Sequence, residues 1–490
     1  MTTMTNIASD SPPRLSHFIA NRFADPGADD YTPHSNPSDV DDVVSLVPGG
    51  SADAASEAID AAQKALGPWR SLPGPARAEH LYRWAGVIAE RQEQLAQTIV
   101  REVGKPIGEA RGEVNRCVVI LRYYAGEAVR SIGDVIPAQV PGALQFSLRE
   151  PLGVVALITP WNFPVAIPLW KAAPAIAFGN TVVLKPAAAA SLIASKLAET
   201  ALAAELPSGV FNVVLGKGSR VGEALLRNKA VRAVSFTGST AVGMRVAAIA
   251  AERNIRYQTE MGGKNVVIVA ADADLDLAAR LSAAGAMRFA GQKCTATSRA
   301  VVVESVQEEF LKRLRREVEA LPLGPVTDPS SAVGPLIDRG SRERIQEALV
   351  GAESHRICGE SLPEDEVFHR GAFFPPTVLR DITADSPLAQ DELFGPVLAV
   401  LPVGDLDAAI ATANDTRYGL SASLFTRDLR TAMDYVRNIE VGLVRVNGDT
   451  TGVDPHAPFG GVKDSSSGSR EQGPAAREFY TEIKTVQINP

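Results

Sequence analysis

GVVALI at residues 153–158 is the first of four short apolar runs that are rich in β-branched residues. The other runs are TVVL at 181–184, FNVVL at 211–215 and VRAVSF at 231–236, and segments with helical patterning lie between them. Short β-branched runs that alternate with helices are typical of βαβ units, whose parallel strands form a doubly wound sheet. This region therefore predicts an α/β domain.

The regions on either side extend this pattern. Residues 1–50 are rich in Asp, Ser and Pro, which predicts an extended lead-in, and Ser51 is suited to cap an Ala-rich helix that runs toward Trp69. Helical patterning then dominates to about residue 130. NVVIVA at 265–270 begins a second alternating stretch that continues past residue 440. We expect a second α/β domain there, and a surface loop at the serine-rich patch 465–469.

Composition narrows the functional class. The chain has 490 residues and a formal net charge of −8. This length exceeds what one core supports, so two or three domains with a cleft between them are expected. The acidic balance argues against a nucleic-acid or anionic-membrane partner, because either would bind a basic face. The segment around Pro12 and Pro13 lacks the apolar core of a secretory signal, and no apolar run is long enough for a membrane helix, so we expect a cytoplasmic protein.

The spacing of the three cysteines resembles neither a disulfide framework nor a zinc site, and no metal is expected. Cys294 stands in the segment Phe289-Ala-Gly-Gln-Lys-Cys-Thr, where Gly291 would let the backbone approach a ligand and Lys293 or nearby amide dipoles would favour a thiolate. Cys117 lies in a helical pattern and Cys358 in a predicted strand, so both are expected to pack as inert residues. That is the commoner role for any lone cysteine, and the residues alone leave the reactivity of Cys294 open.

Three segments far apart in the chain together resemble the aldehyde dehydrogenase superfamily. They are Thr159-Pro-Trp-Asn-Phe-Pro, Glu260-Met-Gly-Gly-Lys and Gly291-Gln-Lys-Cys. The resemblance continues through Phe236-Thr-Gly-Ser-Thr, Glu392-Leu-Phe-Gly-Pro and Pro458-Phe-Gly-Gly, and so extends from about residue 30 to the C-terminus. Thr259 departs from it, because the family usually has an apolar residue at this position.

The resemblance implies a Rossmann-type, doubly wound cofactor domain, a second α/β catalytic domain and a small oligomerisation element. On this basis the cofactor-binding domain is expected at residues 1–130 and 150–261, and the catalytic domain at 262–449. The oligomerisation element and C-terminal tail are expected at 131–149 and 450–490, in a homodimer or homotetramer.

The resemblance also implies a mechanism, in which a Cys294 thiolate attacks the carbonyl of an aldehyde. The Asn162 side chain and the Cys294 backbone N–H would stabilise the oxyanion, Lys171 would relay protons, and Glu260 would activate the water that hydrolyses the thioester. Plainer roles are a solvated strand end for Glu260 and a surface salt bridge for Lys171. Relatives that pass the acyl group to coenzyme A lack this base, so Glu260 favours hydrolysis to a carboxylic acid. The complete set of Asn162, Glu260 and Cys294 also argues against a silent structural or binding protein.

Gly238-Ser-Thr-Ala-Val-Gly243 follows an apolar run and opens a helical pattern, so its amides are suited to receive a pyrophosphate, although such turns are also common without a nucleotide. By resemblance, Lys185 contacts the adenosine ribose and Glu392 the nicotinamide ribose of NAD(P)+. Many NAD-preferring relatives have a glutamate where Ala188 stands, so NADP+ is expected to be accepted, with the preference between the two cofactors open. The other expected cofactor contacts are Thr159, Pro160, Trp161, Thr237, Gly238, Ser239, Gly243 and Phe394.

Four residues are expected to contact the substrate: Arg116, Phe163, Trp170 and Arg288. Arginine binds carboxylate or phosphonate through paired N–H donors, although an arginine on a helix is usually just solvated. The stretch Gly452-Val-Asp-Pro-His-Ala-Pro-Phe-Gly-Gly and the later Arg470-Glu-Gln-Gly resemble the 2-oxoglutarate semialdehyde branch of the family. Trp170 stands where succinate semialdehyde enzymes tend to have a second arginine, which argues against succinate semialdehyde in particular. The two arginines still favour an anionic group on the substrate. We therefore expect a short aldehyde with an anion at its far end.

Overall fold

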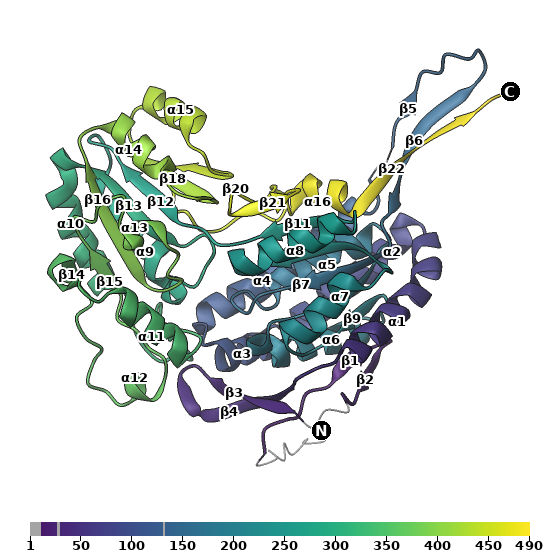
Figure 1. Cartoon of the computed structure of the whole chain (residues 1–490), viewed down its shortest axis with the longest axis horizontal. Helices are drawn as coiled ribbons and strands as arrows, with labels where there is room; N and C mark the ends of the chain where they lie inside the picture. The colour runs from purple at the N-terminus through teal and green to yellow at the C-terminus, as the bar shows by residue number, and fades with distance from the viewer. Residues whose placement is uncertain (1–10, 27–29, 131–132) are drawn as a thin grey trace.

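The computed structural model describes residues 11–26, 30–130 and 133–490. Two helix-covered sheets lie side by side, and a narrow sheet projects from one end of the molecule (Figure 1). Within these three ranges, no helix is both long and apolar enough to cross a membrane.

The larger sheet contains the four runs from which the α/β domain was predicted. Its eight strands lie in the order β2 (Arg22–Ala24), β1 (His17–Ile19), β9 (Phe211–Val213), β8 (Thr181–Lys185), β7 (Val154–Ile158), β10 (Val231–Thr237), β11 (Arg256–Glu260) and β21 (Ser466–Gly468). The five strands from β9 to β11 are parallel, and antiparallel strands occupy both edges. The predicted doubly wound sheet is therefore confirmed.

Helices cover both faces of this sheet, which explains why its central strands are apolar throughout rather than alternating. Val154 and Leu157 of β7, for example, are both fully buried. The predicted cap is confirmed, because the Ser51 hydroxyl accepts from the N–H of Ala54 at 3.1 Å. The helices of this part are α1 (Ala52–Ser71), α2 (Gly74–Glu90), α3 (Gln92–Val103), α4 (Ile107–Glu127), α5 (Ala166–Ala177), α6 (Ser191–Ala203), α7 (Glu223–Arg227) and α8 (Thr240–Glu252).

The described part of the N-terminal lead-in is extended, as expected, but it is integrated into the fold. β1 and β2 add an edge to the larger sheet, and β3 (Tyr31–Asn36) pairs with β4 (Asp39–Pro48) in a separate hairpin. Residues 1–10 and 27–29 of the predicted lead-in lie outside the described residues.

The second sheet confirms the second α/β unit. Its seven strands lie in the order β14 (Arg356–Cys358), β15 (Thr377–Leu379), β16 (Val397–Val403), β13 (Thr297–Val303), β12 (Asn265–Val269), β18 (Ser421–Phe425) and β19 (Leu443–Val446). All pairs are parallel except β14 with β15. Its helices are α9 (Leu275–Met287), α10 (Glu304–Glu319), α11 (Arg339–Ala348), α12 (Val367–Arg370), α13 (Pro387–Gln390), α14 (Leu406–Asn414) and α15 (Leu429–Asn438).

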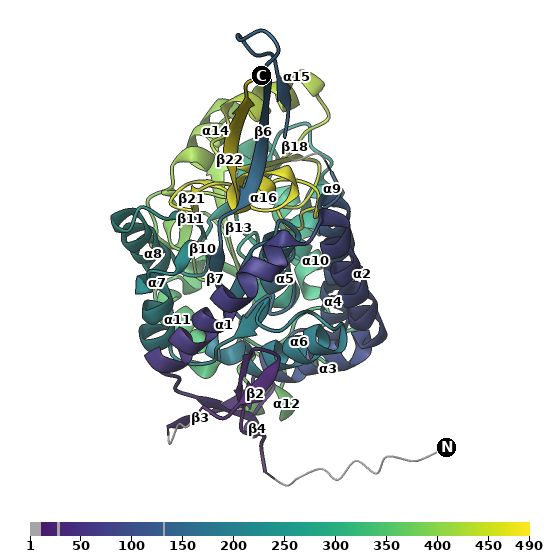
Figure 2. The ribbon, with the colours of Figure 1, turned by 90° about the vertical axis from the view of Figure 1, so that its right-hand side faces the viewer.

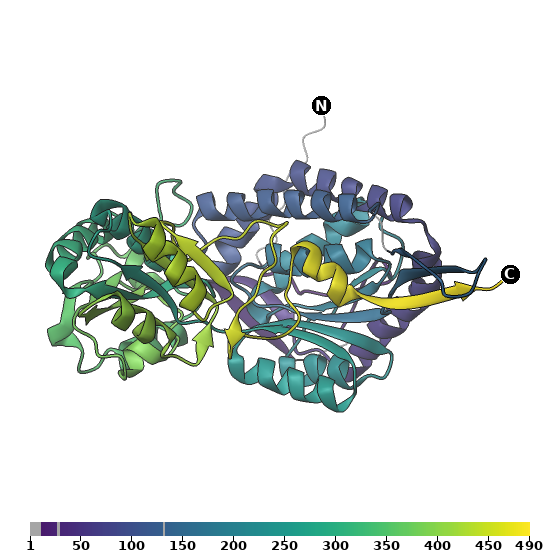
Figure 3. The same ribbon diagram turned by 90° about the horizontal axis from the view of Figure 1, so that it is seen from above.

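The projecting sheet, here called the arm, consists of β5 (Val135–Ile136), β6 (Leu144–Pro151) and β22 (Thr481–Ile488), all antiparallel. In the side view, β6 and β22 rise together from the body of the molecule (Figure 2), and the view from above shows the arm pointing away from the second sheet (Figure 3). The helix α16 (Gly473–Tyr480) leads into β22. The domain boundaries given above stay predictions, and residues 131–132 at the start of the expected oligomerisation element lie outside the described ranges.

The surface loop predicted at residues 465–469 is wrong. Ser466–Gly468 forms β21, which pairs antiparallel with β11 and places Ser466 opposite Glu260. Ser465 is fully buried, and its hydroxyl accepts from the N–H of Gly419 at 3.0 Å. Ser465 and Ser466 are buried because their hydroxyl groups find partners inside the protein, whereas residues 467–469 stay partly exposed.

Candidate active site

Cys294 lies between the two sheets, on the loop that joins α9 to β13. The chain reverses at a tight turn in which Phe289, Ala290 and Gly291 have φ values of 54°, 51° and 65°. A Cβ atom on Gly291 would lie 2.3 Å from the carbonyl oxygen of Gly395, so this position requires glycine. The turn presents Cys294 to a cavity of about 310 Å³. We call this space the central cavity.

Many of the expected site residues line the central cavity. From the first sheet and its loops come Pro160, Trp161, Asn162, Thr237, Gly238 and Ser239, and from the second come Cys294, Glu392 and Phe394. Other lining residues were not singled out from the sequence: Ile167, Met261, Gly262, Gln292, Ile337, Asp338, Ser341, Arg344 and Leu393. The cavity thus combines the two predicted halves of the site.

The surroundings of Cys294 favour the protonated thiol over the thiolate. Burial raises its pKa to about 12, and the charges of Glu392 and Glu260 add to this effect, while the N–H of Thr295 opposes it. Lys293 was expected to favour a thiolate, but its ammonium lies 2.9 Å from the Glu109 carboxylate. That expectation is wrong for Lys293, because its charge is compensated by Glu109 on α4.

The other two cysteines are buried, as expected. Cys117 lies in α4 and Cys358 in β14. Burial raises the pKa of Cys117 well above its usual value and that of Cys358 to about 11.

Asn162 is held by contacts at both its backbone and its side chain. Its amide group donates to the Gln292 carbonyl at 3.0 Å, and its own carbonyl accepts from Lys105 at 2.7 Å. Lys105 forms a fully buried ion pair with Glu113, whose carboxylate also accepts from two backbone N–H groups before and at the start of α5. This support fixes the Asn162 amide beside the loop that carries Cys294.

Glu260 is the last residue of β11, and its carboxyl group is buried rather than solvated. One oxygen accepts from the Ser466 hydroxyl at 2.6 Å, whereas the other has no hydrogen-bond partner among the described residues. Burial and the neighbouring Glu471 raise the pKa of Glu260 well above its usual value. Glu260 does not line the central cavity, although Met261 and Gly262 do.

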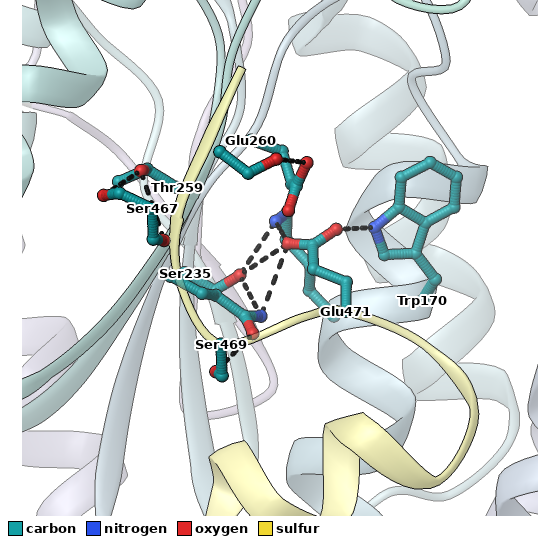
Figure 4. A network of polar contacts seen from close by, with 10 residues as sticks. Trp170, Ser235, Thr259, Glu260, Ser467, Ser469 and Glu471 are labelled. Carbon is teal, nitrogen blue, oxygen red and sulfur yellow. Dashed lines mark hydrogen bonds and ion pairs between the residues drawn. The ribbon is translucent and has the colours of Figure 1, made fainter. Parts of the chain in front are cut away.

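Beneath Glu260 lies a buried polar network that the sequence did not reveal (Figure 4). Lys171 forms an ion pair with Glu471 and donates to the Ser235 hydroxyl at 2.8 Å. The Trp170 indole N–H donates to the same Glu471 at 2.8 Å. The surface salt bridge considered for Lys171 is therefore wrong, since its side chain is fully buried. The quoted segment Arg470-Glu-Gln-Gly contains Glu471, but no local pattern marked it as part of the site.

Several polar groups near the cavity have no partner within the described chain, and they fit a dinucleotide. The Thr159 and Thr237 hydroxyls are buried without hydrogen bonds, and burial lowers the pKa of Lys185 to about 8. Ser239 precedes α8 without capping it through its side chain, which leaves the helix N-terminus available to an anion. Burial raises the pKa of Glu392 to about 7, although this carboxylate accepts from the N–H of Gly263 at 3.1 Å.

Four further expected cofactor positions have defined surroundings. A Cβ atom on Gly243 would lie 2.4 Å from the Met261 sulfur, so glycine allows α8 to pack closely here. The Trp161 and Phe394 rings meet edge-on, 5.7 Å apart. Ala188 lines a separate hollow of about 260 Å³ together with Lys217.

The expected substrate residues do not all meet at Cys294. Arg116 on α4 is half-buried, its Nε has no hydrogen-bond partner among the residues described, and burial lowers its pKa against the opposing charges of Asp454 and Glu113. Arg288 is exposed at the end of α9. Neither arginine lines the central cavity. The Phe163 ring lies against the Lys105 ammonium, 4.0 Å from its centre.

Comparison with known proteins accords with this geometry. The aldehyde dehydrogenase family model matches residues 24–486. The chain is similar to the alpha-ketoglutaric semialdehyde dehydrogenase of Bacillus subtilis, with 43% identity over 97% of this chain and 98% of that protein. It is also similar to the NADP(+) succinate-semialdehyde dehydrogenase of Escherichia coli, with 38% identity over 93% of each chain.

Comparison with solved structures points to the same family. The crystal structure of an NAD-dependent aldehyde dehydrogenase from Sinorhizobium meliloti superposes with a TM-score of 0.92 at 36% identity, over 97% of this chain and 95% of that one. Family match, high identity and near-complete coverage agree with the cavity and its residues. The chain belongs to the aldehyde dehydrogenase family.

Proposed function

We propose that this protein oxidises a short semialdehyde, anionic at its far end, to the carboxylic acid with NAD(P)+ as hydride acceptor. The observation that carries the proposal is the placement of the Cys294 thiol and the Asn162 amide in one cavity, next to Met261, which follows Glu260 in the chain. The semialdehyde dehydrogenases to which the chain is similar support the substrate class.

In the first step, the Cys294 sulfur attacks the aldehyde carbon, and a C–S bond forms. The thiol proton leaves by way of the charged pair Lys171 and Glu471, so Glu260 stays ionised for the second step. The Asn162 amide and the Cys294 N–H stabilise the resulting oxyanion. NAD(P)+, when bound, would supply the acceptor for the hydride that leaves this carbon, and the acyl group would then remain on Cys294 as a thioester.

In the second step, water attacks the thioester carbonyl, Glu260 accepts a proton from that water, and the C–S bond breaks. Lys171 and Glu471 are charged neighbours of Glu260, and they would carry away the proton from the first step. The carboxylic acid leaves, the proton on Glu260 passes to the Cys294 thiolate, and both groups return to their starting state.

Cofactor binding is assigned mostly to groups that lack a hydrogen-bond partner among the described residues, and also to Glu392, which accepts from Gly263. Thr159, Thr237 and the N-terminus of α8 would hold the phosphates and riboses together with Lys185, and Glu392 the nicotinamide ribose. Ala188 offers no carboxylate to repel a 2′-phosphate, so NADP+ is accepted.

The direct test is a panel of aldehydes assayed with NAD+ and with NADP+ by the absorbance of the reduced cofactor, with the product identified by mass. A semialdehyde should be converted to its free acid. Turnover that requires coenzyme A and yields an acyl-CoA would instead show a CoA-acylating enzyme, and no turnover of any aldehyde would refute the proposal.

The arm is proposed as the oligomerisation element of a homodimer or homotetramer. Apolar side chains on this narrow sheet are exposed to solvent, among them Val135, Leu144, Ile483 and Ile488. Sedimentation or light scattering distinguishes the two assemblies from a monomer.

We also propose a cytoplasmic location, because three free thiols suit a reducing compartment, and cell fractionation tests it.

A further inference from the structure

Ser466 has a hydrogen-bond geometry that suits one protonation state of Glu260. Its hydroxyl accepts from the N–H of Gly461 at 2.7 Å and lies 2.6 Å from a Glu260 oxygen. Because a serine hydroxyl has a single hydrogen, and Gly461 already occupies a lone pair, that hydrogen is available to a carboxylate. A hydrogen bond from this hydroxyl is stronger to a charged carboxylate than to a neutral carboxyl group. The arrangement therefore stabilises the ionised form of Glu260.

This contact acts against an otherwise unfavourable environment. Glu260 is buried, the negative charge of Glu471 faces it, and the Cys294 thiol is a further titratable neighbour. Lys171 and Arg470 supply the nearby positive charges, yet neither forms a hydrogen bond to Glu260 among those of the described residues. Ser466 is the donor observed on this carboxylate.

The recess that holds the Glu260 carboxyl group is formed by Gly460 and Ser466. A Cβ atom on Gly460 would lie 2.7 Å from the second carboxylate oxygen, and the φ of Gly460 is +143°. The recess thus has room for the carboxylate only because residue 460 is glycine. Its other wall is the hydroxyl of Ser466.

The next residue offers a matched control. Ser467 lies opposite Thr259 in the strand pair, and the two hydroxyls are 2.9 Å apart. Successive side chains of a strand point to opposite faces, and Figure 4 shows Thr259 and Ser467 on the other side of the strand from Glu260. Removal of the Ser467 hydroxyl perturbs the same strand but leaves the donor to Glu260 in place.

We propose that Ser466 is a positioning residue for hydrolysis of the thioester: its hydroxyl holds the Glu260 carboxylate in the recess and keeps it able to accept a proton from water. The inference rests on the proposed function of Glu260 as the base. It assigns to the serine-rich strand a role in the reaction rather than only in folding.

The test compares Ser466→Ala with Ser466→Thr, which keeps the hydroxyl, and with Ser467→Ala. The readouts are the pH dependence of steady-state kcat and the single-turnover burst of reduced cofactor. Loss of one hydrogen bond to a carboxylate is expected to move the acidic limb of kcat upward by about one to two pH units in Ser466→Ala. Below the limb, the rate falls about tenfold per unit, and at high pH the variant recovers the rate of the parent. Ser466→Thr and Ser467→Ala should keep the limb of the parent, and the burst should persist throughout.

An unchanged limb in folded Ser466→Ala, an equal shift in Ser467→Ala, or a loss of rate that is uniform across pH would overturn the inference. If Ser466→Ala does not fold, Ser466→Cys replaces it, because the thiol is close in size to the hydroxyl but is a weaker donor. Ser466→Cys should shift the acidic limb of kcat upward, and an unchanged limb would overturn the inference. Failure of the parent to oxidise any aldehyde would refute the proposed function itself, and this outcome is distinguishable because it does not depend on Ser466.

Discussion

Replacement of Arg116 by methionine tests the anionic substrate. This change keeps an unbranched side chain of similar length and removes the guanidinium. Arg116 is half-buried on α4, and its Nε lacks a hydrogen-bond partner within the described residues. Burial lowers its pKa, so the guanidinium is already partly desolvated. A substrate carboxylate would accept hydrogen bonds from this guanidinium and so replace the hydrogen bonds to water that burial has removed.

The magnitude follows from the partial burial. A hydrogen bond to a charged group contributes about 1.5–3 kcal/mol, and the lower half of that range applies because solvent still screens part of the side chain. Since about 1.4 kcal/mol corresponds to a factor of ten, kcat/KM for a semialdehyde is expected to fall about 10- to 40-fold. A neutral aldehyde of equal length has no such contact and should change by less than about threefold.

The assay measures kcat/KM for both aldehydes with the parent, Arg116→Met and Arg288→Met. Arg288 is exposed, so its loss is expected to cost at most about fivefold on the anionic substrate. Equal losses on the two aldehydes in Arg116→Met, or a parent that prefers the neutral aldehyde, would refute the reasoning. The arginine would then be a structural residue that balances Asp454 and Glu113.

Three more predictions concern the chemistry. Cys294→Ala should abolish turnover measured by reduced cofactor, whereas Cys117→Ala and Cys358→Ala, which alter buried packing, should keep most of it; normal turnover in folded Cys294→Ala would exclude the thioester route. Glu260→Gln should still give a burst of reduced cofactor in stopped flow while steady-state turnover drops about 100-fold or more, because the base acts after hydride transfer, and loss of the burst itself would contradict that order. Ala188→Glu should raise the NAD+ over NADP+ ratio of kcat/KM by about tenfold or more through repulsion of the 2′-phosphate, and an unchanged ratio would place that phosphate elsewhere.

The sheets and their order of elements could be predicted because parallel strands buried on both faces leave continuous β-branched runs. The run at 153–158 became β7, and that at 265–270 became β12. The short antiparallel edge strands could not be predicted in the same way. Ser466–Gly468 has no apolar pattern at all, and it is a strand because its backbone and hydroxyls pair with β11.

The same distinction between local pattern and long-range contact applies to the site residues. Residues within compact motifs, such as Asn162 and Cys294, could be identified because the motif spans only a few positions. The prediction that Lys293 favours a thiolate is wrong, because its ion-pair partner Glu109 lies 184 residues away in the chain and no local pattern indicates it. Glu471 was missed for the same physical reason: its contacts to Trp170 and Lys171 join positions about 300 residues apart, and burial rather than local sequence makes the pair matter.

The C-terminal segment connects the base to the arm. Within a short stretch it supplies Ser466 beside Glu260 and Glu471 beside Lys171, and it then forms α16 and the arm strand β22. The end of α16 is fixed to the body of the larger sheet, because Asn180 donates to the Tyr480 carbonyl at 3.0 Å and Arg256 to the Glu478 carbonyl at 2.7 Å.

The hydrogen bonds to the Glu478 and Tyr480 carbonyls lie between the polar network and the arm. They fix the position from which β22 extends into the arm. If the arm contacts a second copy of the chain, that interface is connected to the segment beside Glu260 through the eight-residue helix α16. The proposed oligomerisation element and the proposed base are therefore held by one continuous segment of the chain. For this reason the environment of Glu260 is a property of the folded C-terminal segment as a whole, and no motif around Glu260 itself encodes it.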